Sequence, residues 1–261
     1  MSIFDDDKKV IKKENINRGF VTLLYGDSGT GKTFTSLTFP EPIFFIDTEN
    51  RAINTKKLFK DKNISIVEPA MIKKEINKSM DDIFDEVASI NNLTEELSKH
   101  IDKIYKGEIK GGTIVIDSVS DIWSWIQSWM YDRLSKLQTK TGQARASDDL
   151  MSVTSQLDWK VANNKHEGTI RVLRSLIPYG VNIVFTAKEK SVPEYATKTP
   201  SNKEKIRCQK DIPFSSDIIF NLIKQDGKYL AKCEKLGVKE DRDIVIEKLT
   251  YEKILNLKPC E

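Results

Sequence analysis

The sequence has 261 residues, of which 39% are hydrophobic and 31% are charged, a balance typical of a globular protein with a densely charged surface. This composition argues against a chain that is disordered throughout, and a net charge of +3 is too small to indicate nucleic-acid binding by itself. No apolar run is long enough to cross a bilayer, and the N-terminus lacks the basic-then-apolar order of a signal peptide, so we expect a cytoplasmic protein without membrane contact.

Residues 1–17 are rich in charge and have no sustained hydrophobic period, so we expect a charged N-terminal arm. Residues 18–261 are then expected to form one domain. The scattered cysteines and the two isolated histidines indicate neither a disulfide framework nor a zinc site. We expect His100 and His166 to lie on the surface.

The first predicted strand, residues 20–25, is short, apolar and rich in β-forming residues, and it ends at a glycine loop. That loop and the two residues after it match the phosphate-binding pattern G-x-x-x-x-G-K-[ST] at every fixed position. In this pattern the glycines let backbone N–H groups turn toward phosphate oxygens, the lysine reaches the β- and γ-phosphates, and the hydroxyl binds magnesium. The sequence therefore predicts an ATP and magnesium site at the start of a helix, formed by Gly26, Asp27, Ser28, Gly29, Thr30, Gly31, Lys32, Thr33 and Phe34.

Two further apolar runs predict buried strands that end on acidic residues. Residues 43–47 end on Asp47, with Glu49 close behind, and a β-branched run leads to Asp117. A P-loop needs an acid at a neighbouring strand tip to orient the hydrated magnesium opposite the Thr33 hydroxyl, and Asp117 fits this role. Hydrolysis also needs a carboxylate that orients and deprotonates water. Asp47 and Glu49 both remain candidates, because they project to the same side of an extended backbone.

Helical and strand patterns alternate along the rest of the chain. The expected helices span residues 71–106 (one helix or two), 122–134 and 149–176, and the expected strands span 181–186, 217–223, 229–233 and 244–246. Trp123, Trp125 and Trp129 lie on a strongly apolar helix, so we expect core or subunit-interface positions for them. The order predicts an α/β fold with a mostly parallel central sheet, helices on both faces and an antiparallel C-terminal edge.

These motifs together resemble the RecA-like superfamily of P-loop ATPases, in particular its small phage-type and archaeal members implicated in single-strand DNA annealing and recombination. Beside the P-loop, the resemblance is carried by residues 44–49, by the Walker B-like residues 114–119, by Asp158-Trp159 with Asn163, and by residues 182–190. It implies a RecA-like ATPase domain and assigns the catalytic base to Glu49. It also implies that Thr186 senses the γ-phosphate and that Lys235, or Lys232, acts as a cation in a neighbouring subunit's ATP site.

In this superfamily, two loops that follow the Walker B region and the sensing strand touch single-stranded DNA. The matching segments here, residues 138–145 and 188–210, carry many lysines and arginines that could track a phosphate backbone, and a tyrosine that could stack on a base. Acidic residues among them leave open the alternative that these loops are simply solvated. The expected DNA contacts are Lys140, Arg145, Lys188, Lys190, Tyr195, Lys203, Lys205 and Arg207.

We therefore expect a magnesium-dependent ATPase that assembles into a ring or filament and acts on single-stranded DNA in recombination, repair or annealing. A single-strand DNA-binding protein is a candidate further partner. The alternative is a nucleotide-gated regulatory or scaffold ATPase that switches a protein partner without DNA contact. A small-molecule kinase is less favoured, because Asp47 and Glu49 suit the activation of water better than phosphoryl transfer to a substrate.

Overall fold

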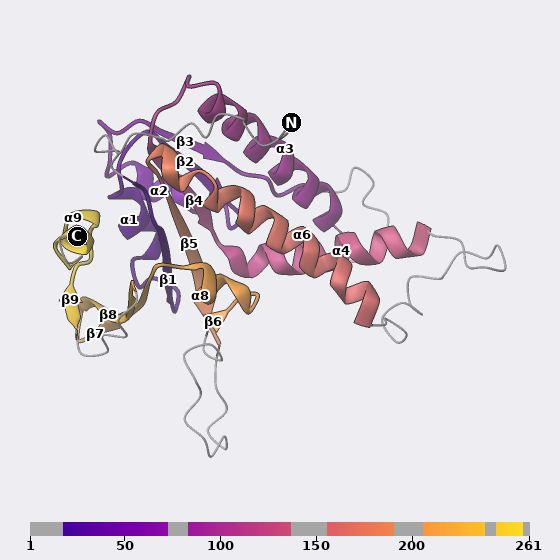
Figure 1. Ribbon diagram of the computed structural model, residues 1–261. Coiled ribbons are helices and arrows are strands. Elements are labelled where there is room, and N and C mark those ends of the chain that lie inside the picture. Colours follow the sequence, from indigo (N-terminus) through magenta and orange to yellow (C-terminus); the bar gives the residue numbers. More distant parts are fainter. Residues whose placement is uncertain (1–17, 73–82, 137–155, 191–205, 238–243, 258–261) are drawn as a thin grey trace, which may run out of the picture.

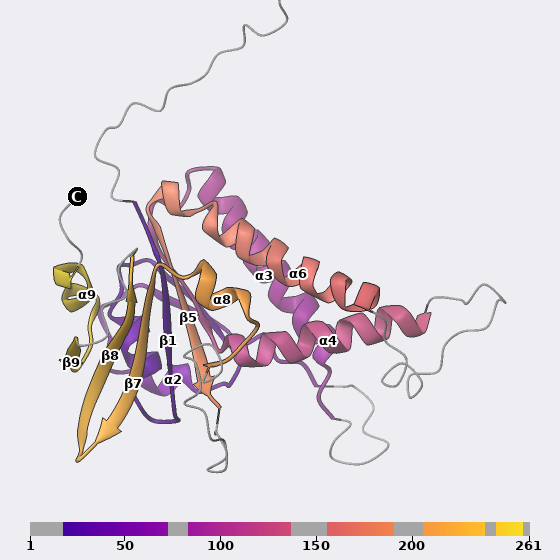
Figure 2. The same cartoon turned by 60° about the horizontal axis from the view of Figure 1, so that its bottom comes forward.

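A computed structural model of the chain describes residues 18–72, 83–136, 156–190, 206–237 and 244–257. Within these ranges, nine strands form one sheet, and helices cover both of its faces (Figures 1 and 2). The expected N-terminal arm, residues 1–17, lies outside the described residues.

The strand order places the P-loop strand in the middle of the sheet. The strands are β1 (Val21–Gly26), β2 (Ile43–Asp47), β3 (Ile64–Val67), β4 (Gly112–Asp117), β5 (Val181–Glu189), β6 (Ile206–Arg207), β7 (Ile218–Gln225), β8 (Lys228–Leu236) and β9 (Val245–Glu247). Their order is β3-β2-β4-β5-β1-β7-β8-β9, with β6 paired to β5. The pairs from β3 to β7 are parallel, whereas β8, β9 and β6 pair antiparallel. The mostly parallel sheet with an antiparallel C-terminal edge is therefore confirmed.

The inner strands explain the continuous apolar runs in the sequence. Every residue of β1, β2 and β4 is buried, because helices cover these strands on both sides. Parallel neighbours also bring their carboxyl ends to one edge of the sheet, which is where β1 gives way to the glycine loop. The acidic tips of β2 and β4 meet at this same edge, with Asp47 opposite Asp117 in the register.

Two helical layers enclose the sheet. The helices are α1 (Lys32–Leu37), α2 (Ala52–Lys56), α3 (Glu86–Tyr105), α4 (Val119–Lys136), α6 (Gln156–Arg174), α8 (Asp211–Ser215) and α9 (Tyr251–Leu257), with a 3-10 turn at Ile177–Tyr179. The long helices α3, α4 and α6 contribute to one apolar core, and α1, α2 and α9 to the core on the opposite face. Trp125 is buried in the first core, and Trp123 and Trp129 pack against it, as expected for core aromatics. No helix in the described ranges has both the length and the apolar character needed to cross a membrane.

The surface location expected for the histidines is wrong for His166, which is only 3% exposed. The centre of its ring lies 5.7 Å from that of Trp123, and the two rings, one from α6 and one from α4, are nearly perpendicular. His100 is half-buried and stacks on Phe44 of β2 at 4.0 Å. Burial lowers the pKa of each imidazole to about 4, so both rings pack as neutral aromatic groups. The sequence pattern missed this because a neutral imidazole can take an aromatic position in a core.

Candidate functional site

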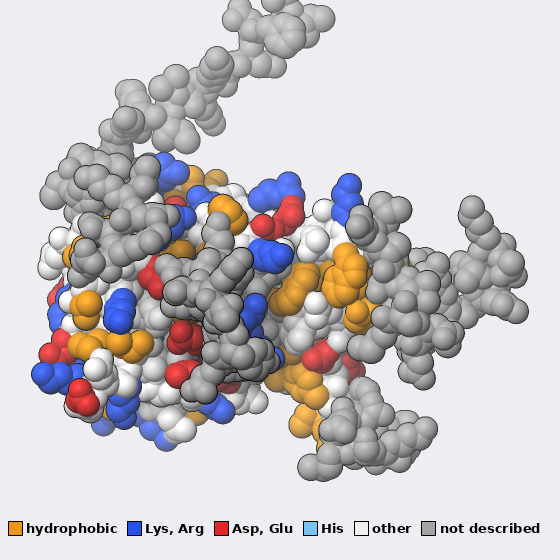
Figure 3. Space-filling view, turned by 90° about the horizontal axis from the view of Figure 1, so that it is seen from below, with side chains coloured by type: hydrophobic (Ala, Val, Ile, Leu, Met, Phe, Trp, Pro, Cys, Tyr) orange, Lys and Arg blue, Asp and Glu red, His pale blue; other side chains and the backbone are white. Residues whose placement is uncertain are grey.

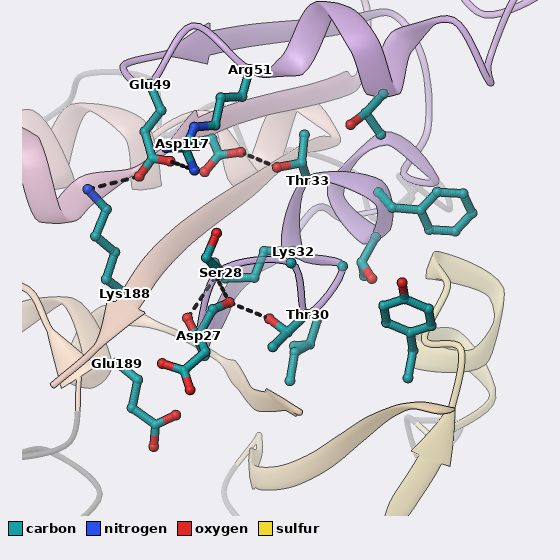
Figure 4. Close-up of a pocket in the computed structure, with 18 of the residues that line it drawn as sticks. Asp27, Ser28, Thr30, Lys32, Thr33, Glu49, Arg51, Asp117, Lys188 and Glu189 are labelled. Atoms are coloured by element: carbon teal, nitrogen blue, oxygen red, sulfur yellow. Dashed lines mark hydrogen bonds and ion pairs between the residues drawn. The ribbon is translucent and has the colours of Figure 1, made fainter. Parts of the chain in front are cut away.

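The glycine loop between β1 and α1 lines a pocket at the carboxyl edge of the sheet (Figure 4). Gly26 and Gly31 have positive φ angles of 148° and 96°, a conformation that favours glycine. A Cβ atom on Gly26 would lie 2.1 Å from the carbonyl oxygen of Leu222 in β7, so this position also has no room for a side chain. All nine residues predicted to hold the nucleotide, from Gly26 to Phe34, line the pocket.

The ammonium of Lys32 lies inside the loop. Its Nζ donates to the carbonyl oxygens of Gly26 and Asp27, each at 2.7 Å. Burial lowers the pKa of Lys32, while the negative charges of Asp117 and Glu49 oppose that shift. A phosphate oxygen would offer this ammonium a charged acceptor, which is a stronger partner than a backbone carbonyl.

Asp117, at the tip of β4, joins three elements of the site. Its Oδ2 accepts a hydrogen bond of 2.7 Å from the Thr33 hydroxyl of α1, and its Oδ1 accepts one from the Thr186 hydroxyl of β5. Burial raises the pKa of this carboxyl, while the two hydroxyl donors favour its charged form. The side chains of Thr33 and Asp117 thus offer two oxygen atoms beside the phosphate loop, the ligand type that magnesium prefers.

The structure separates the two acids that follow β2. Asp47 is 1% exposed, and its carboxylate accepts hydrogen bonds from the backbone N–H groups of Glu49 (3.1 Å) and Ala52 (2.6 Å). Asp47 therefore stabilises the turn into α2, and it is not among the described residues that line the pocket. Glu49 does line the pocket, where its carboxylate meets Lys188 and Arg51. The expectation that the two side chains project together is wrong, because β2 ends at Asp47 and the chain turns there.

Lys188, near the end of β5, points into the pocket (Figure 4). Its Nζ lies 2.9 Å from Glu49 Oε1 and 2.9 Å from Asp121 Oδ1. Burial disfavours the charged ammonium, but hydrogen bonds and ion pairs with the two acids outweigh it and raise the pKa of Lys188. The sequence interpretation grouped Lys188 with the DNA contacts. Lys188 follows Thr186 by two residues on the same strand, so the two side chains project from the same face of the sheet. That spacing was the sequence signal for the position of Lys188 beside the nucleotide site.

Thr186 itself is fully buried and is not among the described residues that line the pocket. Its hydroxyl contacts Asp117, so it positions that carboxylate. Lys235 lies in β8, and its Nζ donates to the backbone oxygens of Pro213 (3.3 Å), Phe214 (3.4 Å) and Ser216 near the end of α8. In the single chain, Lys235 thus holds α8 against the antiparallel edge, and Lys232 is exposed on the same strand.

Two predicted DNA contacts are exposed near the β5–β6 pair: Lys190 directly follows β5, and Arg207 is the last residue of β6. Arg207 also lines the pocket, and it lies opposite Lys188 in the strand register. The face seen from below has lysine, arginine and acidic side chains interspersed (Figure 3). The other predicted contacts, Lys140, Arg145, Tyr195, Lys203 and Lys205, lie outside the described residues.

Comparison with known proteins gives one family match. A family model described as an AAA domain matches residues 18–234, which is most of the chain. A search of curated proteins found no match to the sequence. The matched range contains the glycine loop, both acidic strand tips and Lys188, and it ends within β8.

Proposed function

Since the chain belongs to this AAA domain family, and so has a nucleotide-binding ATPase-type domain, we propose that it is a RecA-like, magnesium-dependent ATPase acting on single-stranded DNA in recombination or annealing. The observation that carries the ATPase proposal is the meeting of four groups in one pocket: the glycine loop with Lys32, the Thr33–Asp117 pair, Glu49 and Lys188. They come from the start of α1 and from the carboxyl ends of four strands, β1, β2, β4 and β5, so the strand order brings them together rather than any local motif.

Each residue has a chemical role in this proposal. The loop N–H groups and Lys32 bind the β- and γ-phosphates. The oxygen of the attacking water bonds to the γ-phosphorus while the bond from that phosphorus to the β–γ bridging oxygen breaks, and Glu49 accepts a proton from the water. Magnesium, held by Thr33 and Asp117, would neutralise charge on the phosphates. Thr186 orients Asp117. Lys188 pairs with Glu49 before nucleotide binds and has the γ-phosphate as an alternative anionic partner afterwards.

The DNA part of the proposal rests on the basic strand ends beside the pocket. Both Lys190, which directly follows β5, and Arg207, which pairs with Lys188 in the β5–β6 register, are exposed there. A phosphate backbone bound by these cations would lie close to the residue that contacts Glu49. Assembly into a ring or filament, with Lys235 or Lys232 reaching a neighbour's site, belongs to the same proposal. To reach a neighbour's site, the Lys235 ammonium would have to give up its hydrogen bonds to the backbone oxygens of Pro213 and Phe214.

ATP turnover, measured with and without a single-stranded oligonucleotide, tests this function. We expect DNA to raise the turnover, and ATP with magnesium to tighten DNA binding in a salt-sensitive manner. Oligonucleotide retention should fall steeply between low and moderate salt, because each phosphate contact releases counterions. ATP hydrolysis that is unaffected by DNA, together with salt-independent retention, would instead favour a nucleotide-gated switch that acts on a protein partner.

A further inference from the structure

The pocket continues well beyond the glycine loop. Its volume is about 1630 Å³, larger than the roughly 300–1,000 Å³ of a usual small-molecule site. On the side of α1 it is lined by residues of α1 and β8, by α2 and the chain just after it, and by the chain after β9. We call this part the base end; its lining residues are Phe34, Thr35, Thr55, Leu58, Tyr229, Leu230, Ala231, Lys248, Leu249, Thr250 and Lys253.

Exposed apolar side chains gather at the base end. Phe34 is 40% exposed, Leu58 71% and Tyr229 38%, although all three line a pocket. Phe34 follows the last residue of the P-loop motif, and its ring lies 5.2 Å from the ring of Phe59. Large apolar surfaces that stay exposed beside a polar site indicate a ligand with an apolar part.

Tyr229 lies directly beside the glycine loop. Its Cδ1 would be 3.7 Å from a Cβ atom built on Gly31, so the ring borders the point where the loop becomes α1. The ammonium of Lys224 lies 5.2 Å from the centre of the same ring and helps to fix its position. A group attached to a phosphate tail in the loop is therefore within reach of this aromatic side chain.

The outer wall of the base end comes from the chain after β9, outside the family-matched residues. Two hydrogen bonds fasten this wall to the P-loop helix and the residue that follows it: Thr35 Oγ1 donates to the Leu249 oxygen (3.2 Å), and Tyr251 N donates to Thr38 Oγ1 (2.9 Å). The ring of Tyr251 also packs on Phe39 at 4.9 Å. The wall is therefore held in place relative to the phosphate loop.

We infer that the base end receives the nucleobase of a nucleoside triphosphate by stacking and apolar contact, and that it accepts adenine and guanine with little discrimination. This inference rests on the proposed function, because the phosphate loop must hold the triphosphate. An aromatic platform tolerates different bases, since every base has a π face. Thr55 and Thr250 also line this end, and a hydroxyl can donate or accept, so both are compatible with either purine edge.

Binding measurements on the full chain with magnesium test the inference. Isothermal titration should give dissociation constants for ATP and GTP that agree within about tenfold, because stacking does not distinguish the purine edges. Tyr229→Ala should weaken both nucleotides on the order of tenfold, whereas Tyr229→Phe, which keeps the ring, should bind them like the wild type. Tyr179→Ala, at an exposed tyrosine that is not among the described pocket residues, serves as the control.

Inorganic tripolyphosphate separates this inference from the proposed function. It has no base, so Tyr229→Ala should bind it as tightly as the wild type, which also reports that the variant is folded. Unchanged nucleotide affinity in Tyr229→Ala, or dissociation constants for ATP and GTP that differ by more than about tenfold, would overturn the inference while ATP binding stands. If the wild type binds neither nucleotides nor tripolyphosphate, the proposed function fails, and the inference falls with it.

Discussion

Glu49 and Lys188 form an ion pair of 2.9 Å inside the pocket, although one follows β2 and the other lies in β5, with β4 between these strands (Figure 4). The pair joins the proposed catalytic carboxylate to the strand end that continues toward the basic residue Lys190. A γ-phosphate would compete with Glu49 for the ammonium of Lys188. Nucleotide binding would then release the Glu49 carboxylate from this ion pair.

Replacing Lys188 tests this connection. Lys188→Ala is expected to lower ATP turnover by at least about tenfold, since a cation near the transferred phosphate is lost, while Lys188→Arg keeps the charge and should retain more of the activity. Steady-state hydrolysis with magnesium measures the effect. Normal turnover combined with weakened oligonucleotide binding would instead make Lys188 a DNA contact, the role indicated by the sequence alone.

Lys190 is the described lysine best placed to contact DNA, being exposed just after β5. Lys190→Ala should weaken oligonucleotide binding at every sequence tested and reduce the slope of log affinity against log salt by roughly one, as the loss of one phosphate contact implies. ATP turnover without DNA should not change. Lys103→Ala, at an exposed lysine of α3, should leave the salt slope intact. Equal behaviour of the two variants would argue against DNA contact at β5.

Asp117 is expected to lower the stability of the fold while supporting ATP hydrolysis. An acid whose pKa is raised by burial stabilises the fold below its unfolded-state pKa, and this contribution is lost as the pH rises through the folded-state value. At neutral pH its charge is therefore a cost. Asp117→Asn should raise the melting temperature of the nucleotide-free chain by roughly a few degrees, while magnesium-dependent hydrolysis falls by orders of magnitude.

Asp121→Asn gives the matched comparison for Asp117, because the Asp121 carboxylate is paired with Lys188. Here the neutral amide should lower the melting temperature rather than raise it. Thermal unfolding of both variants in the presence of a chelator measures the difference. A lower melting temperature for Asp117→Asn would show that its two hydroxyl donors outweigh the cost of burial.

His166 makes the fold sensitive to acid. Burial lowers its pKa from 6.5 to about 4, so the unfolded chain takes up a proton at a higher pH than the folded chain. The free energy of unfolding is expected to fall as the pH drops from about 6.5 to about 4, with a contribution of roughly 3 kcal/mol from this ring. His166→Phe keeps a ring against Trp123 and removes the titration, so its denaturant midpoint should vary less over this range. Parallel curves for the two proteins would contradict this role.

The sequence predicted what depends on local pattern. The glycine loop, the buried strands and the positions of Asp117 and Glu49 at or after strand ends follow from motif and periodicity, and the structure brings these residues to one edge of the sheet. The strand β3 was missed. Ile64–Val67 has only four residues and follows a polar stretch, so it gives little periodic signal.

Contacts between distant segments could not be predicted in this way. Asp47 accepts hydrogen bonds in the turn before α2 because β2 ends at this residue. Lys188 lies beside Glu49 because of the order of three strands in the sheet. The wall formed by residues 248–253 depends on how the C-terminal segment packs on α1. Each is set by tertiary packing, which periodicity along the chain does not encode.

The most direct test of the catalytic centre is to measure ATP affinity and ATP turnover together in Glu49→Gln. The account predicts an affinity close to that of the wild type, because the glycine loop and Lys32 are intact, and a turnover reduced by about a hundredfold to ten-thousandfold, because no carboxylate accepts the proton of the attacking water. Lys32→Ala should instead weaken the affinity for ATP itself. A Glu49→Gln protein that hydrolyses ATP at the wild-type rate would contradict the account and require a different group to activate the water.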